Sequence, residues 1–214
     1  MKPSNDIPDT KNAAAFNLVK DNLSEVIKKI YLVGITGAGG AGKTTFANNL
    51  VTYFGKENSI TIDLDDYLIS REERKLKNIV GYDLKANKLE LARTHLSMLK
   101  DGQTIYKPRY NHSNGEILVD EIVKPKKLIV VEGVTTLYPQ LKDLYDFTIF
   151  MDALEETQIK SRIKRDVKKR GYTKEEAMTL FEKMKPAYKN LIEPTKALAD
   201  AVCVVDIDYI MHFK

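Results

Sequence analysis

The sequence predicts an α/β protein: a parallel sheet with helices on both faces and a small antiparallel hairpin insertion. Apolar segments of strand length alternate with segments whose apolar residues recur at helical spacing, a pattern typical of parallel sheets. A glycine-rich segment, 37–42, stands between the first such strand and the next helix. Two further segments, 104–110 and 116–123, flank a short polar turn and predict the hairpin.

The first quarter of the chain is predicted to contain a tail, a helix, a strand and a second helix. Residues 1–12 are polar and contain two prolines, so we expect a flexible tail. Apolar residues at helical spacing predict a helix over 13–29. The continuously apolar segment 30–36 is typical of a buried strand, and the helix after the glycines should end at about residue 54.

The middle of the chain carries a second strand and the hairpin. Residues 59–64 predict a strand that ends in acidic residues, whereas the polar stretch 66–82 shows no regular pattern. A helix is expected over 86–100, because an aspartate and a glycine follow it as a stop signal. The hairpin insertion should then occupy about 103–124.

The C-terminal half returns to the alternation of strands and helices. Short apolar segments predict three further core strands, at 128–131, 147–151 and 201–205. Two charged helices are expected before the last strand, over 155–169, where Gly171 ends the helix, and over 175–185. Residues 13–214 show no linker or repeat and are predicted to form a single domain.

Composition narrows the class of protein. Of 214 residues, 43% are hydrophobic and 30% are charged, which is typical of a globular chain with a sizeable core. No apolar stretch approaches the roughly 20 residues of a membrane span, and the polar N-terminus lacks a secretory signal, so we expect a cytoplasmic protein with no membrane partner. A single cysteine excludes an internal disulfide framework. The net charge of +4 suits anionic small ligands but is too small to indicate nucleic acid.

The glycine-rich segment fits the phosphate-binding pattern G-x-x-x-x-G-K-[ST], with a strand before it and a helix after it. Its glycines let backbone N–H groups approach phosphate oxygens, and the helix dipole favours the same anion. Lys43 is expected to bridge the outer phosphates of ATP, and the Thr44 hydroxyl to bind Mg²⁺. The sequence therefore predicts a P-loop NTPase-type sheet whose nucleotide-binding residues are Gly37, Ala38, Gly39, Gly40, Ala41, Gly42, Lys43, Thr44 and Thr45.

Carboxylates follow two of the predicted strands. Asp65 comes after the second strand and Glu132 after the third, and ligands of an open parallel sheet bind beyond such strand ends. Asp65 is a candidate general base that accepts the proton of a substrate hydroxyl, with Asp63 and Asp66 as competitors. Glu132 is a candidate magnesium-associated carboxylate, and the alternative for both groups is a role in capping loops.

Three of the chain's seven arginines, Arg162, Arg165 and Arg170, cluster on the first charged helix. A solvated helix face is the common fate of a basic run, and a nucleic-acid patch would need interleaved aromatic residues. The fixed fork of arginine suits phosphate oxygens, so we expect the helices of about 153–185 to form a lid over the phosphates.

With these residues in place, the chain resembles the phosphoribulokinase/uridine kinase family of P-loop kinases over about residues 30–206. The blocks that carry the resemblance are Leu64-Asp65-Asp66-Tyr67, Tyr82-Asp83, Lys107-Pro108-Arg109-Tyr110-Asn111-His112, Val131-Glu132-Gly133, Arg165–Gly171 and Ile192-Glu193-Pro194-Thr195-Lys196. The resemblance implies that Asp65 is the base and Glu132 the magnesium carboxylate. It implies that Lys43, Arg165 and Arg170 act on the transferred phosphoryl group, and that the acceptor binds Asp83, Tyr110, His112 and Arg162.

The resemblance further implies an ATP-dependent kinase, with Mg²⁺, that phosphorylates a hydroxyl of a pentose-containing small molecule. Length favours the uridine kinase branch, whereas the KPRYNHSNG and LDDY segments favour the phosphoribulokinase branch. Leu68 stands where the latter branch has histidine, and Arg71 is an uncertain match to its substrate arginine. The acceptor is thus ribulose 5-phosphate or a nucleoside such as uridine or cytidine, with pantothenate or nicotinamide riboside as alternatives. The family also implies a homo-oligomer.

Two other functional classes stay open. A GTP-dependent switch needs a guanine-reading motif that ends in Asp, and the nearest segment, Asn87–Glu90, ends in Glu inside a predicted helix. A nucleotide-binding module without turnover would not need an acceptor-side base such as Asp65. An ATPase assay with and without hydroxylated acceptors separates these classes from a kinase.

Overall fold

The computed structural model describes residues 17–21 and 30–214. These residues form a six-stranded sheet in the order β2-β5-β1-β6-β7-β8, together with a two-stranded sheet, β3-β4. Neighbouring strands from β2 to β7 are parallel, and β8 runs antiparallel to β7. The expected tail lies outside the described residues, as does the predicted helix over 13–29 apart from its helical residues 17–21. The α/β class and the hairpin predicted from the sequence are confirmed.

The strands begin and end close to the predicted positions. The strands of the main sheet are β1 (Tyr31–Gly37), β2 (Ser59–Asp63), β5 (Leu128–Glu132), β6 (Phe147–Ala153), β7 (Ala201–Val205) and β8 (Met211–Phe213). The hairpin consists of β3 (Ile105–Tyr110) and β4 (Ile117–Val123). Every residue of β1 and β5 is buried, as expected for central strands of a parallel sheet covered on both faces.

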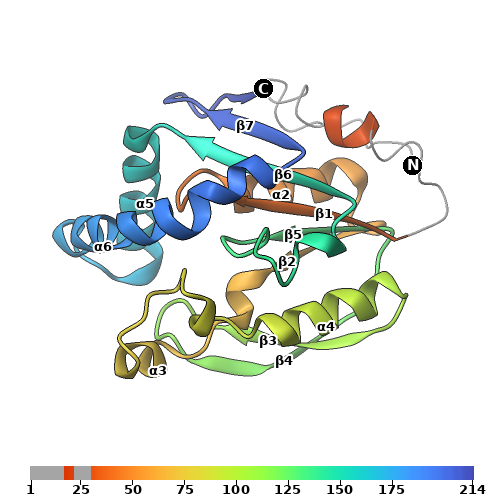
Figure 1. Cartoon of the computed structure of the whole chain (residues 1–214), viewed down its shortest axis with the longest axis horizontal. Helices are drawn as coiled ribbons and strands as arrows, with labels where there is room; N and C mark the ends of the chain where they lie inside the picture. The colour runs from red at the N-terminus through yellow and green to blue at the C-terminus, as the bar shows by residue number, and fades with distance from the viewer. Residues whose placement is uncertain (1–16, 22–29) are drawn as a thin grey trace.

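The α-helices lie around this sheet (Figure 1). They are α2 (Lys43–Phe54), α3 (Arg71–Leu76), α4 (Leu89–Lys100), α5 (Glu155–Arg170) and α6 (Lys174–Ala187). Helix α2 covers one face and α4 the other, while α3, α5 and α6 lie at the end of the sheet that the P-loop faces (Figure 1). In the described part of the chain, no helix is both long and apolar enough to cross a membrane.

Successive residues of the strands point to opposite faces of the sheet and pack into two separate cores. Val33 and Ile35 of β1 pack with Phe46 and Leu50 of α2. The other face of the sheet packs against α4 through buried residues that include Leu32, Ile62, Leu96, Ile129 and Phe150. Both cores hold the strand ends in a fixed relation, and the candidate site lies at those ends.

Four elements of the described structure were not predicted. Strand β8 is only three residues long, and α3 sits in the polar stretch that was expected to be irregular. Ser70 caps the N-terminus of α3, because its hydroxyl accepts the Glu73 N–H. This cap stabilises the start of a helix that has no buried residue. After α6 the chain continues in a π-helical turn, Tyr188–Ile192, and a 3-10 helix, Glu193–Leu198.

Candidate active site

The P-loop connects the end of β1 to the start of α2. The Lys43 side chain is only 9% exposed and curls back over the loop, where Nζ donates to the carbonyls of Gly37 and Ala38, both at 3.0 Å. Burial lowers the pKa of Lys43, while the carboxylates of Glu132 and Asp65 oppose that shift. The ammonium group is therefore held inside the loop by hydrogen bonds and by negative charge at the neighbouring strand ends.

Two glycines of the loop allow other elements to approach closely. A Cβ on Gly37, which has φ of 128°, would lie 1.9 Å from the Met151 carbonyl oxygen of β6. A Cβ on Gly40, with φ of 90°, would lie 2.7 Å from the Gln158 carbonyl oxygen of α5. Real Cβ atoms do not come this close, so the loop needs glycine at both positions for β6 and α5 to pack against it.

Thr44 and Glu132 meet beside the loop. Thr44 Oγ1 donates to Glu132 Oε1 at 2.7 Å, and Glu132 is the last residue of β5. Burial raises the pKa of Glu132, whereas Lys43 and the Thr44 hydrogen bond lower it. A hydroxyl and a carboxylate are the hard oxygen donors that Mg²⁺ prefers, and kinases complete its shell with water and substrate phosphates. The pair therefore fits the predicted magnesium site.

The structure gives the three neighbouring aspartates different surroundings. Asp63 ends β2 beside Glu132, and its Oδ1 accepts the Asp65 N–H at 2.8 Å. Burial raises the pKa of Asp63 well above its ordinary value, and the charges of Asp65 and Glu132 add to this. Asp66 is bound by the hairpin through Lys107 and through the Tyr110 N–H. Within the described residues, no side-chain hydrogen bond or ion pair engages the Asp65 carboxylate, which supports its assignment as the base over its neighbours.

The arginines of the predicted lid surround a buried carboxylate on α5. Asp166 is fully buried, and its Oδ1 accepts from Arg165 Nε at 2.9 Å and lies 3.3 Å from Arg170 Nη1. Arg162 is 6% exposed and stacks over the Phe181 ring at 5.3 Å, and its Nε is buried without a hydrogen-bond partner in the described structure. A buried guanidinium with an unused donor fits an anionic ligand.

Two of the residues predicted to bind the acceptor, Tyr110 and His112, lie in the hairpin and its turn. The Tyr110 hydroxyl accepts from Arg74 Nη2 at 2.6 Å, and its ring meets His112 edge-on at 5.1 Å. Arg170 Nη2 contacts His112 Nδ1 at 3.2 Å, so the lid reaches the hairpin. Because the guanidinium can only donate, His112 is neutral in this contact and carries its proton on Nε2. Asp83 differs from the other predicted pocket residues, since its carboxylate caps a turn by accepting the Lys85 N–H at 2.8 Å.

Comparison with known proteins places these features in a family. The model described as "Phosphoribulokinase / Uridine kinase family" matches residues 32–207. The chain belongs to this family. A phosphoribulokinase from Synechocystis sp. is 38% identical over 181 residues, which are 84% of this chain and 54% of that protein. A uridine kinase from Clostridium perfringens is 32% identical over 184 residues, which are 82% of this chain and 88% of that protein.

The chain spans about half the length of the phosphoribulokinases it matches. Among solved structures, D-glycerate 3-kinase from Cryptococcus neoformans var. grubii has a TM-score of 0.74 at 13% identity, covering 96% of this chain and 99% of that one. That likeness shows a shared fold. The phosphoribulokinase/uridine kinase family thus accounts for both the sequence blocks and the sheet of this chain.

Two cavities flank the P-loop of this family member. One of about 410 Å³ opens between the hairpin and the strand ends, and its lining includes Thr44, Asp63, Tyr110, His112 and Glu132. The other, of about 210 Å³, lies between the P-loop and the lid, and its lining includes Gly39, Tyr82, Arg162, Phe181 and Tyr188. Of the four predicted acceptor residues, Tyr110 and His112 line the larger cavity and Arg162 lines the smaller one, whereas Asp83 is in neither lining.

Sequence reasoning missed the structural contacts of two basic residues at this site. Lys107 is buried beneath the hairpin, and Arg71 donates to the carbonyls of His112 and Ser113 at 2.7 and 3.2 Å. Arg71 therefore holds the hairpin turn, whereas it had been considered as a substrate arginine. Lys107 stands in the KPRYNH block, so its position was visible, but its burial has no signature in the sequence.

Proposed function

We propose that this chain is an ATP-dependent kinase that transfers the γ-phosphoryl group to a hydroxyl of a pentose-containing small molecule. The observation that carries the proposal is the convergence of Lys43, the Thr44–Glu132 pair and the unengaged Asp65 carboxylate at one end of the sheet. A nucleotide-binding module without turnover has no use for an acceptor-side carboxylate in this place. Family membership supports the same reaction class.

The proposed reaction proceeds by positioning and charge neutralisation. The P-loop N–H groups and Lys43 bind the phosphates of ATP. Thr44 and Glu132 would hold Mg²⁺, which would supply positive charge beside those phosphates. The acceptor oxygen forms a bond to the γ-phosphorus as the bond to the β-phosphate oxygen breaks, and the hydroxyl proton passes to Asp65. Arg165 and Arg170 neutralise charge on the transferred group, and lid closure keeps water out.

Two acceptors are favoured by different observations. Ribulose 5-phosphate comes first, because the relative that is 38% identical is a phosphoribulokinase. Arg109 lines the larger cavity, and its side chain is 59% exposed with a 3.8 Å contact to Glu121, so it can turn to a phosphate. Uridine comes second, because the uridine kinase relative is matched over 88% of its own length. Cytoplasmic location, a homo-oligomeric state and the lack of nucleic-acid and membrane partners stay predictions.

The test is an acceptor panel with MgATP, comprising ribulose 5-phosphate, uridine, cytidine, nicotinamide riboside and pantothenate. ADP release and the mass of the product are measured for the wild type and for Asp65→Asn. We expect acceptor-dependent turnover that falls roughly 10²–10⁴-fold in the variant, the usual scale for a positioned base, with MgATP binding retained. ATP hydrolysis that no acceptor stimulates, or a variant within a few fold of wild type, would contradict the proposal.

A further inference from the structure

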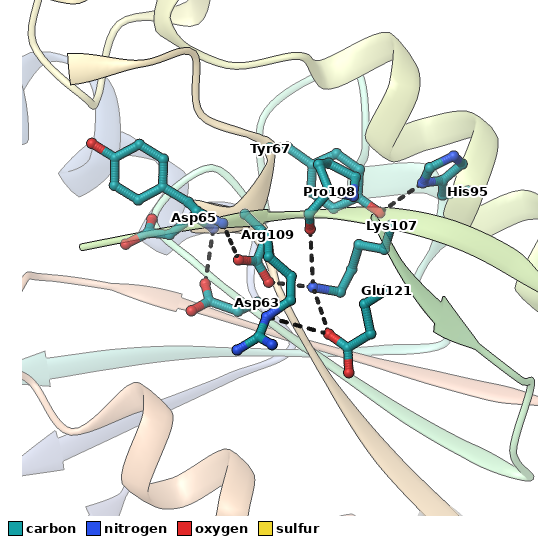
Figure 2. Close-up of polar contacts among 10 residues, drawn as sticks. Asp63, Asp65, Tyr67, His95, Lys107, Pro108, Arg109 and Glu121 are labelled. Carbon is teal, nitrogen blue, oxygen red and sulfur yellow. Dashed lines mark hydrogen bonds and ion pairs between the residues drawn. The ribbon is translucent and has the colours of Figure 1, made fainter. Parts of the chain in front are cut away.

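The hairpin is tied to the turn that carries Asp65 by a buried ion pair. Lys107 of β3 is 4% exposed, and its Nζ donates to Asp66 Oδ2. The same ammonium group also donates to the Pro108 carbonyl at 3.3 Å (Figure 2). A lysine is rarely buried unless a partner compensates its charge, and here the partner is the residue directly after the candidate base.

The hairpin carries a register irregularity directly after this lysine. The pairing of β3 with β4 shifts register between Lys107 and Arg109, and both Lys107 and Pro108 are buried. Successive strand residues normally point to opposite faces, so burial of two in a row requires such an irregularity. Bulges occur often beside active sites, where they re-aim a side chain. In this hairpin Lys107 keeps the inward face of Ile105, and the irregularity brings Pro108 and Tyr110 to the buried side as well.

The second oxygen of Asp66 is bound by the hairpin as well. Asp66 Oδ1 accepts the Tyr110 N–H at 2.8 Å, so one carboxylate contacts β3 at two points. Tyr110 in turn is two residues before His112, and both line the larger cavity. A short path of direct contacts thus joins the base to the acceptor residues, from Asp65 through Asp66 to Tyr110.

Other side chains lie on two sides of the Lys107–Asp66 pair. Glu121 of β4 lies 3.8 Å from both Lys107 Nζ and Arg109 Nε. On the inner side, the Tyr67 hydroxyl hydrogen-bonds His95 Nδ1 at 3.0 Å, as Figure 2 shows. Burial lowers the pKa of His95, and the Lys107 charge lowers it further. The charge of Lys107 is therefore matched chiefly by Asp66, the closest carboxylate.

We propose that Lys107 is a positioning residue, whose bond to Asp66 fixes the Asp65 carboxylate relative to the acceptor hydroxyl held by the hairpin. This inference rests on the proposed function. The base and the acceptor pocket come from separate segments, after β2 and in β3–β4, and a link between them sets the distance across which the proton moves. A misplacement of about 1 Å can cost on the order of 10²-fold in rate.

The test compares Lys107→Met, Lys107→Arg, Asp66→Asn and the Lys107→Met/Asp66→Asn double variant with Lys124→Met, an exposed lysine just after β4. Acceptor and MgATP kinetics are measured with ribulose 5-phosphate and, in parallel, with uridine. We expect Lys107→Met to lower kcat/KM for the acceptor by about 10- to 100-fold, with KM for MgATP within twofold. Lys107→Arg should recover part of the loss, and the double variant should be no worse than the worse single one.

Hydrogen–deuterium exchange gives a readout that does not need the acceptor. Lys107→Met should speed exchange in 64–68 and in 105–112 together, whereas Lys124→Met should affect neither segment. A lysine that only supports folding would lower kcat by the loss of active protein, with both KM values unchanged and no rescue by arginine. That result, additive single effects or unchanged exchange would overturn the inference.

If Lys107→Met does not fold, Asp66→Asn and Lys107→Arg carry the same comparison. Failure of the proposed function appears separately, as a wild type that phosphorylates neither acceptor or an Asp65→Asn variant that stays active.

Discussion

Hydrogen bonds and nearby charges hold the Lys43 side chain within the P-loop. Its ammonium donates to two carbonyls of its own loop, and the negative strand ends oppose the effect of burial on its pKa. Phosphate oxygens can replace these carbonyls, because they lie within reach of the same three donors. The side chain is therefore close to its working position before the phosphates arrive, which lowers the ordering cost of binding.

Replacement of Lys43 by alanine should weaken MgATP binding and turnover together. In the proposed reaction the ammonium group contacts phosphates in both the ground state and the transition state, so its loss should raise the ATP dissociation constant and lower kcat. Isothermal titration with MgATP and steady-state kinetics measure the two effects, with the exposed Lys56→Ala as the matched control. Unchanged ATP binding in Lys43→Ala would contradict the P-loop assignment.

His112 should make acceptor use sensitive to acid. Burial lowers its pKa, Arg170 and Arg165 lower it further, and Asp65 opposes them. The folded state therefore binds fewer protons than the unfolded state, and His112 reduces the free energy of unfolding as pH falls below its ordinary pKa of about 6.5. Protonation also removes the acceptor atom of the Arg170 contact.

We expect kcat/KM for the acceptor to fall as pH is lowered from about 8 to about 5, across the histidine range. His112→Gln should show a lower but flatter profile, because it cannot gain a charge there. The comparison uses the pH profiles of kcat/KM for the acceptor and for MgATP. Parallel acid limbs in the wild type and the variant would assign the titration to another group.

At the scale of elements, α3 acts as a brace for the hairpin turn. Arg71 binds the carbonyls of His112 and Ser113, and Arg74 binds the Tyr110 hydroxyl and stacks over its ring at 5.2 Å. The Arg71 N–H also donates to the Gly115 carbonyl at 2.9 Å. Helix α3 has six residues and none of them is buried. Its contacts with the hairpin turn therefore hold both segments in place.

Arg71→Ala should raise KM for ribulose 5-phosphate and for uridine by a similar factor. A hydrogen bond from a charged donor contributes about 1.5–3 kcal/mol. An increase in KM of about tenfold or more is therefore expected, because about 1.4 kcal/mol corresponds to a factor of ten. Lys75→Ala, an exposed change on the same helix, is the control. An effect confined to the phosphorylated acceptor would show instead that Arg71 binds its phosphate.

Local sequence signals explain which elements could be predicted. The strands β1, β5 and β7 and the hairpin were visible, because apolar runs and turn residues mark them independently of the rest of the chain. Helix α3 and strand β8 lack such marks, since α3 depends on contacts with the hairpin and β8 on pairing with β7. The P-loop was likewise visible as a local motif, whereas the Lys107–Asp66 pair joins residues 41 positions apart, which no local pattern marks.

At the scale of the whole molecule, the packing of the sheet between two cores buries the thiol of Cys203 in strand β7. Cys203 is fully buried in the core on the α2 face, and burial raises its pKa to about 12. A thiol reacts with disulfide reagents as the thiolate, which is scarce at such a pKa. The only cysteine of the chain therefore reports on opening of the sheet.

Cys203 should react with Ellman's reagent far more slowly in the native protein than in urea. The expected native rate equals the rate of the unfolded chain multiplied by the fraction of molecules that are open. Stopped-flow labelling over a urea series measures it, and circular dichroism gives the unfolding transition for comparison. Complete labelling of the native protein at the unfolded rate would show that the β7 edge is open.

The order of the strands divides the site between two sets of elements. In the proposed function, the turn after β2, helix α3 and the hairpin form the acceptor side, whereas the P-loop after β1 and helix α5 after β6 form the phosphate side. The Arg170–His112 contact is one place where the two sets meet. Mutations that alter acceptor choice can thus accumulate between residues 64 and 123 while the segments 31–54 and 147–170 keep their sequence. For kinases with the proposed function, the preferred acceptor can therefore change many times in a lineage while the phosphate donor stays the same.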